Sequence, residues 1–412
     1  MFLSRAVSLA ILGSAAAFSP PLSLSQMGAP KLQQGLCAGQ TSRVGLTGPT
    51  MNVDHDILLR SARGEKVDRS PVWLMRQAGR YMKEFRAYSE KYPFRHRSET
   101  PEIAIELSLQ PFRSFGTDGV IMFSDILTPL PSMGIEFDVI KGSGPKIFTP
   151  IRSMDQVKAL TPIDDPEKTV PFLKPILSSL RKEVEGKSTL LGFVGAPFTL
   201  AAYSIEGKAD KNMFHTKQMM LHNPEIVHAF LEHVTENIAD YAAYQVECGA
   251  QVLQVFESWA HHIGPDDFST FAKPYADRAI AKIKAKCPDT PVIYFANGGS
   301  AYLERQRDMK ADMICVDWSV DMAEARKILG ADVPISGNVD PLVLMGPEAK
   351  IRAAVRDCVS KAGGHSHILN LGHGVIQPTP EEGVRIFVDE AKKFKYADIP
   401  AYQAGNVKEL VA

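Results

Sequence analysis

Two arginines four residues apart, Arg76 and Arg80, directly follow a short apolar run. If residues 76–80 form a helical turn, both guanidinium groups lie on one face. Adjacent positive charges repel unless an anion joins them, and the planar guanidinium fork suits a carboxylate or a phosphate. The pair indicates an anion-binding site, and the alternative is two surface arginines in separate salt bridges.

Asp125 is the most informative acid in the chain, because it follows the apolar run Gly119–Phe123. A carboxylate above a dry core can accept N–H hydrogen bonds from a ligand or stabilise a developing cation. The alternative is that Asp125 caps the next helical segment.

Metal and phosphate chemistry have weaker support. The close histidine pairs, His261-His262 and His365-x-His367, have no carboxylate or cysteine at ligand spacing. Gly186–Ser188 resembles the end of a phosphate loop, but Arg181 stands where the first glycine is required. We expect no metal site, and a phosphate ligand remains an alternative to a carboxylate.

Eight strand-like apolar runs alternate with helix-like segments. The runs are Pro71–Met75, Gly119–Phe123, Thr189–Val194, Gln251–Phe256, Val292–Ala296, Met313–Val316, Val333–Ser336 and His367–Leu371. This alternation predicts an α/β fold, a single-domain (β/α)8 TIM barrel over residues 51–412. The alternative is a doubly wound sheet, which favours a glycine-rich first turn, and that turn here holds only Gly79.

The helix-like segments include one long amphipathic stretch and several shorter ones. They are Thr100–Phe115, Asn223–Cys248, Ala301–Arg307, Ala323–Leu329 and Pro380–Tyr396. After the second strand, Gly134–Val139 and Lys146–Thr149 flank the turn-forming run Lys141–Pro145. This pattern predicts an inserted β-hairpin over one end of the barrel.

The barrel interpretation predicts where the chemistry lies, because active sites of this fold sit at the carboxyl ends of the strands. Polar or glycine-rich residues follow every run. They are Arg76–Tyr81, Ser124-Asp125, Gly195–Thr199 with Tyr203, Glu257–Trp259, Asn297–Gly299, Asp317-Trp318, Gly337–Asp340 and Gly372–Gly374. We expect these residues to gather at one mouth of the barrel.

The first fifty residues differ from the rest in charge. They hold Arg5, Lys31 and Arg43 and no acid, whereas the remainder carries 43 positive and 47 negative residues. Arg5, the apolar run Ala6–Leu12 and small residues up to Ala17 are typical of a signal peptide over residues 1–17. Residues 18–50 are typical of a transit peptide, so the leader predicts the plastid (chloroplast) stroma. The alternative is a simple secretory signal.

The overall composition is that of an ordinary globular protein. The net charge of −1 argues against a nucleic-acid binder. The five cysteines include no Cys-x-x-Cys pair, which excludes a disulfide scaffold. No apolar run after the leader is long enough for a membrane span.

Several motifs resemble those of the uroporphyrinogen decarboxylase family. Pro71–Tyr81 resembles its first signature, and Gly192–Tyr203 resembles its second, with Phe198 where Trp is common. Phe123–Leu127, Phe256–Ser258 and Asn370–Gly374 also match. The likeness spans roughly residues 53–398.

The resemblance implies a homodimeric (β/α)8 barrel, without metal or organic cofactor. It would act as a carboxy-lyase on the four acetate side chains of uroporphyrinogen III, giving coproporphyrinogen III for haem and chlorophyll biosynthesis. It implies catalytic roles for Asp125, Arg76, Tyr203 and His373. The substrate-binding residues it implies are Arg76, Gln77, Ala78, Gly79, Arg80, Asp125, Phe193, Tyr203, Phe256, Ser258 and His373.

The chemistry of the residues is consistent with that reaction. The pyrrole ring can act as the electron sink for loss of CO2 once its α-carbon is protonated, so no cofactor motif is required. Asp125 would offset the resulting cation, and Tyr203, His373 or a bound water would supply the final proton. Two alternatives are a zinc-dependent corrinoid or folate methyltransferase of the same superfamily and a non-catalytic porphyrinogen carrier.

Overall fold

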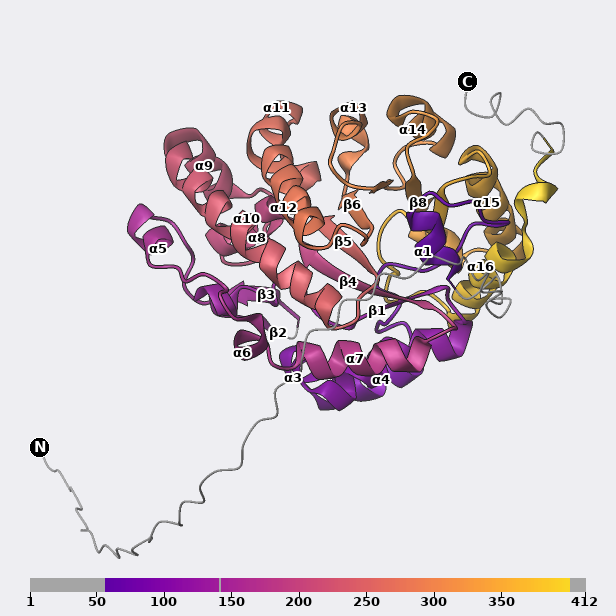
Figure 1. Cartoon of the computed structure of the whole chain (residues 1–412), viewed down its shortest axis with the longest axis horizontal. Helices are drawn as coiled ribbons and strands as arrows, with labels where there is room; N and C mark the ends of the chain where they lie inside the picture. Colours follow the sequence, from indigo (N-terminus) through magenta and orange to yellow (C-terminus); the bar gives the residue numbers. More distant parts are fainter. Residues whose placement is uncertain (1–55, 141, 401–412) are drawn as a thin grey trace, which may run out of the picture. The chain divides into compact units, whose positions relative to one another are not determined.

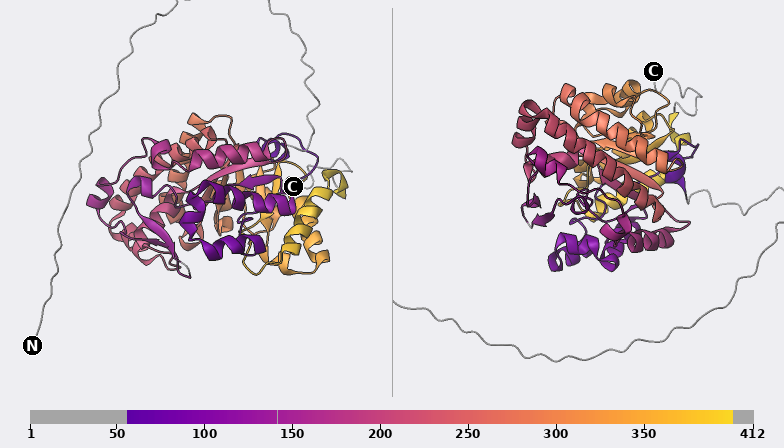
Figure 2. Two further views of the ribbon diagram at one scale, coloured as in Figure 1. Left: turned by 90° about the horizontal axis from the view of Figure 1, so that it is seen from below. Right: turned by 60° about the vertical axis from the view of Figure 1, so that its left-hand side comes forward.

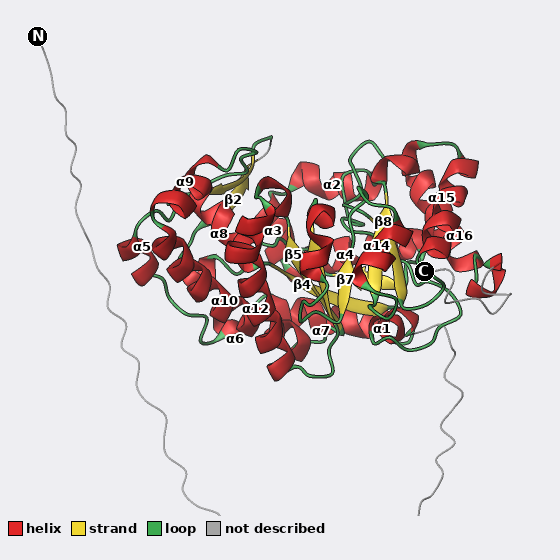
Figure 3. Cartoon of the chain, turned by 90° about the horizontal axis from the view of Figure 1, so that it is seen from above, coloured by secondary structure: helices red, strands yellow, loops and turns green. Residues whose placement is uncertain are grey.

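The computed structural model describes residues 56–140 and 142–400. Seven parallel strands form a curved sheet in the order β1-β4-β5-β6-β7-β8-β9, with helices around it (Figures 1 and 3). The strands are β1 (Gly119–Ile121), β4 (Thr189–Gly195), β5 (Val252–Glu257), β6 (Val292–Ala296), β7 (Met313–Cys315), β8 (Ile335–Val339) and β9 (His367–Leu371). Each strand pairs in parallel with the next in this order, which confirms the (β/α)8 class.

The first predicted strand, Pro71–Met75, is not a regular strand, and this part of the prediction was wrong. The segment nevertheless lies between β9 and β1. The Leu369 N–H donates to the Pro71 carbonyl at 2.9 Å, and the Asp118 N–H donates to the Val72 carbonyl at 2.8 Å. The segment therefore occupies the eighth position of the ring.

Side chains explain why this segment is irregular. The N–H of Val72 donates to Asp118 Oδ2 at 2.8 Å, and the N–H of Met75 donates to Asn370 Oδ1 at 3.0 Å. Asp118 is itself held by the buried Arg69, whose two terminal nitrogens reach its oxygens at 2.7 and 2.9 Å. Side-chain oxygens thus satisfy N–H groups that a regular ladder would pair with carbonyls.

Helices fill most of the connections between the strands. They are α1 (Ile57–Ala62), α2 (Lys83–Lys91), α3 (Phe94–Glu99), α4 (Pro101–Phe115), α5 (Met154–Lys158), α6 (Pro166–Thr169), α7 (Leu173–Val184), α8 (Pro197–Glu206), α9 (Phe214–His222), α10 (Pro224–Glu247), α11 (Pro265–Asp267), α12 (Lys273–Lys286), α13 (Leu303–Gln306), α14 (Met322–Leu329), α15 (Glu348–Lys361) and α16 (Glu381–Lys393). The predicted helical segments correspond to α4, α10, α13, α14 and α16. The seventh predicted strand, Val333–Ser336, begins and ends too early, because the corresponding strand β8 covers Ile335–Val339.

The predicted hairpin is present after β1. Strands β2 (Phe137–Ile140) and β3 (Gly144–Ile147) pair in antiparallel fashion, with Phe137 opposite Ile147. Lys141, within the predicted turn, lies outside the described residues. The Ile147 N–H donates to the Gly207 carbonyl at 2.8 Å, which fastens the hairpin to the end of α8.

The hydrophobic core has two parts. One part fills the barrel and includes Trp73, Leu191 and Phe295, with Leu58 of α1 among them. The other part lies between the sheet and the surrounding helices. The early and late helices meet, since α1 contacts β9 and α16 contacts α4 (Figures 1 and 2).

No helix within residues 56–140 and 142–400 combines the length and apolar character that crossing a membrane requires. The predicted signal peptide, residues 1–17, and the predicted transit peptide, residues 18–50, lie outside the described residues.

Candidate active site

Arg76 leaves the barrel through a turn rather than a helix. Its backbone has φ of +59°, in the left-handed region that non-glycine residues rarely occupy. The expectation of a helical turn over residues 76–80 was therefore wrong. The exposed Arg76 side chain lies over Gly374, since a Cβ at that position would fall 2.3 Å from Arg76 Cδ. The loop after β9 thus supports Arg76 at the mouth.

The rest of the first signature divides into buried and exposed parts. Gln77 is 1% exposed, and its amide bonds the Leu74 N–H at 3.2 Å and the Gly119 carbonyl at 3.1 Å. The Gln77 side chain therefore joins Pro71–Met75, the first barrel segment in chain order, to β1. Ala78 and Gly79 are half-buried loop residues, and Arg80 is exposed.

Asp125 lies half-buried just beyond β1, as predicted. Its Oδ1 accepts a hydrogen bond from the Leu127 N–H at 2.8 Å, so it also caps the following turn. Burial raises the pKa of Asp125, while the Leu127 N–H and the positive charge of Arg76 oppose that rise. The carboxyl group is therefore within electrostatic range of Arg76.

Aromatic rings form one wall of the mouth. Phe193 of β4 meets Phe256 of β5 edge-on with ring centroids 5.7 Å apart, and Phe256 meets Phe295 of β6 at 6.1 Å. His373 continues the series, stacked 6.4 Å from Phe295 and 6.0 Å from Trp318. Phe256 and Trp318 offer apolar surface to a flat ring system, while the buried Phe295 packs behind Phe256.

Tyr203 brings a hydroxyl to the same region from α8. Its ring packs edge-on against Trp259 at 5.1 Å. Burial and the negative charge of Asp125 raise the pKa of Tyr203 to about 12, and Arg76 opposes them. Tyr203 is therefore protonated at neutral pH and can donate a hydrogen bond.

A buried network fixes Ser258. The Ser258 N–H donates to Thr199 Oγ1 at 2.8 Å, and Thr199 in turn donates to the carboxyl group of Glu257. Asn297 donates to the Ser258 carbonyl at 3.2 Å. Burial raises the pKa of the fully buried Glu257 to about 7. Thr199 of α8 and Asn297 after β6 thus fix the backbone of Ser258 at the end of β5.

His373 is neutral at physiological pH. Burial and the nearby positive charges of Arg76 and His261 lower the pKa of His373 to about 4, against a smaller opposing effect of Asp317. A ligand carboxylate beside the imidazole would raise this pKa. Arg76 is thus within electrostatic range of Asp125, Tyr203 and His373.

The sequence interpretation missed two residues of this region. Phe295 lies opposite Phe256 in the parallel register, and counting residues back from each strand end would have found it. The hydroxyl of Tyr241 on α10 forms a hydrogen bond with Ser124. Burial and the negative charge of Asp125 raise the pKa of Tyr241. No local pattern distinguishes Tyr241 from an ordinary core residue of an amphipathic helix.

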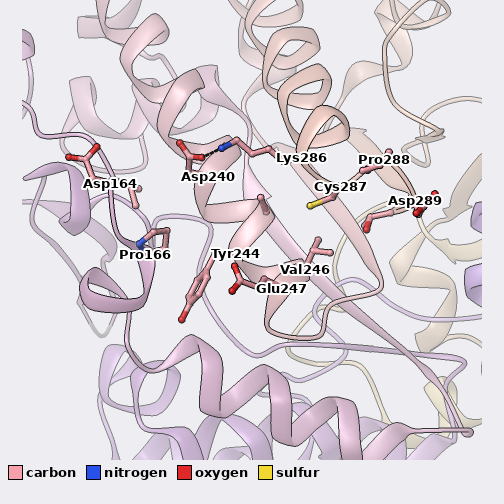
Figure 4. A pocket seen from close by; sticks show the side chains of 13 residues that line it. Asp164, Pro166, Asp240, Tyr244, Val246, Glu247, Lys286, Cys287, Pro288 and Asp289 are labelled. Carbon is pink, nitrogen blue, oxygen red and sulfur yellow. Dashed lines mark hydrogen bonds and ion pairs between the residues drawn. The ribbon is translucent and has the colours of Figure 1, made fainter. Parts of the chain in front are cut away.

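A separate cavity of about 780 Å³ lies where the chain leads into the amino ends of β5 and β6 (Figure 4). It lies among the residues before α6, the end of α10 and the turn leading into β6, where Lys286 pairs with Asp240. None of the predicted site residues lines it. In this fold the amino-terminal face serves stability rather than catalysis, so we assign the candidate site to the mouth.

Among the described residues, no group of three or more His, Cys, Asp or Glu side chains is placed to hold a metal ion. The mouth combines guanidinium groups, the half-buried acid Asp125, a protonated phenol and aromatic rings. These groups define a barrel site suited to a flat, polyanionic ligand.

The profile of the family described as "Uroporphyrinogen decarboxylase (URO-D)" matches residues 54–394, and the chain belongs to this family. The uroporphyrinogen decarboxylase of Picosynechococcus sp. is 56% identical over 82% of this chain and 96% of its own length. That of Crocosphaera subtropica is 55% identical over 82% of this chain and 96% of its own length. A methyltransferase from Methanosarcina mazei shares the fold, with a TM-score of 0.69, 20% identity, and coverage of 83% of this chain and 98% of its own.

Proposed function

We propose that this chain is a carboxy-lyase that converts uroporphyrinogen III to coproporphyrinogen III by removing CO2 from its four acetate side chains. The relatives at 55–56% identity support this activity. The observation that carries the proposal is the mouth itself, where Arg76 is within electrostatic range of Asp125, Tyr203 and His373. A substrate with eight carboxylates and a central set of N–H donors complements these groups.

The residues divide the binding task by chemistry. Arg76 and Arg80 bind side-chain carboxylates, and Ser258 and His373 contact further carboxylates. Phe193 and Phe256 pack against the macrocycle, and the buried Phe295 packs behind Phe256. Asp125 accepts hydrogen bonds from the pyrrole N–H groups. Gln77 contributes by holding the loop of Ala78 and Gly79, because its amide already bonds two backbone groups.

The reaction proceeds through the pyrrole ring. Protonation of its α-carbon gives an iminium-like cation, and the negative charge of Asp125 stabilises it in a partly buried site. The bond between the acetate methylene and the carboxyl carbon breaks, CO2 leaves, and its bonding electrons neutralise the cation. A proton then converts the methylene carbon to methyl, and the α-carbon releases the proton that it gained at the start, which restores the aromatic pyrrole.

Two groups at the mouth are candidates for the proton donor. Tyr203 holds its proton at neutral pH, because burial and the negative charge of Asp125 raise its pKa to about 12. His373 becomes a donor when a bound carboxylate raises its pKa. Comparing Tyr203→Phe with His373→Gln in single-turnover decarboxylation, with binding measured separately, distinguishes the two.

The proposal extends to assembly and location. A homodimer is supported by the exposed apolar side chains Trp318, Leu342 and Met345, which follow β7 and β8. Sedimentation analysis of the chain from Met51 onward tests it. Delivery to the plastid stroma rests on the charge pattern of residues 1–50, and import of a fluorescent fusion of this segment tests that.

The experiment that tests the activity incubates the chain from Met51 onward with anaerobically prepared uroporphyrinogen III. Stepwise formation of hepta-, hexa-, penta- and tetracarboxylate products, unaffected by a metal chelator, is the expected result. Tight binding without product would indicate a carrier. Stoichiometric zinc with no decarboxylation would indicate the methyltransferase alternative.

A further inference from the structure

Arg97 of α3 is a buried cation that has no acidic partner among the described residues. Its side chain is 7% exposed, and its Nε donates to the Tyr92 carbonyl at 3.1 Å. Its Nη1 is buried and has no hydrogen-bond partner. Within residues 56–140 and 142–400, no ion pair joins Arg97 to a carboxylate. A buried charge in this state is costly, so its presence requires a physical reason.

Other buried arginines of the described chain are compensated. Arg69 forms a two-pronged pair with Asp118. Arg326 donates to a set of backbone carbonyls, including that of Ala362 at 2.8 and 3.0 Å. Arg95, two residues before Arg97, pairs with Glu99 at 2.6 Å. Arg97 therefore differs from Arg95, Arg69 and Arg326, whose charged groups have carboxylate or several carbonyl partners.

Aromatic faces partly replace the missing counter-ion. The guanidinium carbon of Arg97 lies 5.4, 5.3 and 5.6 Å from the ring centroids of Phe85, Phe94 and Phe123. These contacts favour a cation over the ring faces but do not neutralise its charge. The three rings hold the guanidinium group in place, but its positive charge is not neutralised.

The position of this charge connects it with the site. Phe123 is two residues before Asp125, so Arg97 lies close to the segment that carries the predicted catalytic acid. Arg97 also lies over Phe85 of α2, and the next residue of that helix, Arg86, donates from Nη1 to the Arg80 carbonyl at 3.0 Å. Burial and the positive charge of Arg80 lower the pKa of Arg97, in keeping with this arrangement. The connection that contains α2 and α3 follows the first barrel segment and so belongs to the mouth of the barrel (Figure 3).

We propose that Arg97 is a positioning and specificity residue, whose uncompensated charge beside Arg80 tunes the mouth for a ligand bearing many carboxylates. Repulsion from Arg97 keeps the Arg80 guanidinium turned toward solvent, where a carboxylate can reach it. A bound carboxylate relieves that repulsion, so binding is favoured beyond the direct contact. The inference rests on the proposed function and adds a residue that does not itself touch the substrate.

The test compares Arg97→Gln, Arg97→Lys and the control Arg95→Gln, a change at a paired arginine on the same helix. In Arg97→Gln, we expect KM for uroporphyrinogen to rise roughly fivefold to tenfold with kcat nearly unchanged. The dependence of KM on salt concentration becomes shallower. Arg97→Lys restores most of the affinity, and Arg95→Gln leaves KM and its salt dependence at wild-type values.

A binding measurement separates this inference from the proposed activity. Fluorescence titration with uroporphyrin and coproporphyrin gives dissociation constants for eight and four carboxylates without turnover. Arg97→Gln should weaken uroporphyrin binding more than coproporphyrin binding. If the wild type decarboxylates uroporphyrinogen but Arg97→Gln keeps its KM, salt dependence and porphyrin affinities, Arg97 has only a packing role. If the wild type neither binds nor decarboxylates, the proposed function itself fails.

Discussion

The side chain of Arg76 lies directly against the backbone of Gly374. A Cβ added at residue 374 would fall 2.3 Å from Arg76 Cδ and 2.6 Å from its Cγ. The two residues come from opposite ends of the chain, since Arg76 follows the first barrel segment and Gly374 follows β9. The position of the principal candidate anion-binding group thus depends on the absence of a side chain far away in the sequence.

Gly374→Ala is expected to displace Arg76 without disturbing the barrel. Because misplacement of a binding group by about 1 Å can cost up to 100-fold in activity, we expect kcat/KM to fall at least about tenfold. The thermal midpoint should remain close to that of the wild type. Gly264→Ala is the matched control, since nothing lies within 4 Å of its added Cβ. Equal activity in the two variants would disprove the dependence of Arg76 on Gly374.

Asp125 has two separable roles, and two substitutions distinguish them. Asp125→Asn keeps a side-chain oxygen for the Leu127 N–H but removes the negative charge. We expect it to retain the wild-type melting temperature and to lose roughly 100-fold or more in kcat. Asp125→Ala loses the cap as well, with a further cost of about 1 kcal/mol in stability. Full activity in Asp125→Asn would leave capping as the only role of this residue.

Regular spacing explains what was predictable from sequence. Seven of the eight strand-like runs form strands, and the hairpin follows from a turn-forming run between two short strands. The irregular first segment was not predictable, because the side chains of Asp118 and Asn370 that bond it are distant in sequence. Within the mouth, the residues at strand ends were found, whereas Arg97 was missed because its lack of a counter-ion is a property of the folded chain.

Glu257 should make the fold less stable as the pH rises toward neutrality. Burial raises its pKa from 4.5 to about 7 in the folded chain, so the native state binds a proton that the unfolded chain releases. This contribution to stability is complete below pH 4.5 and is lost as the pH rises through about 7. Glu257→Gln mimics the protonated acid and removes this dependence. Its free energy of unfolding relative to the wild type should increase between pH 5 and pH 7, measured by urea denaturation. A constant difference over that range would contradict the buried neutral acid.

His367 should have the opposite dependence on pH. Its Nε2 faces the Gly337 carbonyl at 2.9 Å and must carry the proton, while Nδ1 accepts from Ser70 Oγ at 2.8 Å. Burial lowers the pKa of His367 to about 3, so the unfolded chain binds a proton below pH 6.5 that the native state rejects. The stabilising contribution is complete above pH 6.5 and is lost toward pH 3, at a limiting slope of about 1.4 kcal/mol per pH unit.

The two titrations therefore oppose each other between about pH 4.5 and 6.5, and single and double variants can separate them. His367→Gln should be less stable than the wild type at pH 7, because it loses buried hydrogen bonds, but should lose less stability on acidification to pH 5. Glu257→Gln should lose more than the wild type over the same interval. The double variant should return close to the wild-type slope, because each substitution removes one of two opposing proton-binding differences. Urea midpoints at pH 5.0, 5.5, 6.0 and 6.5 measure all four slopes. If the His367→Gln slope equals that of the wild type, His367 is protonated in the native state, contrary to its donation to Gly337 and acceptance from Ser70.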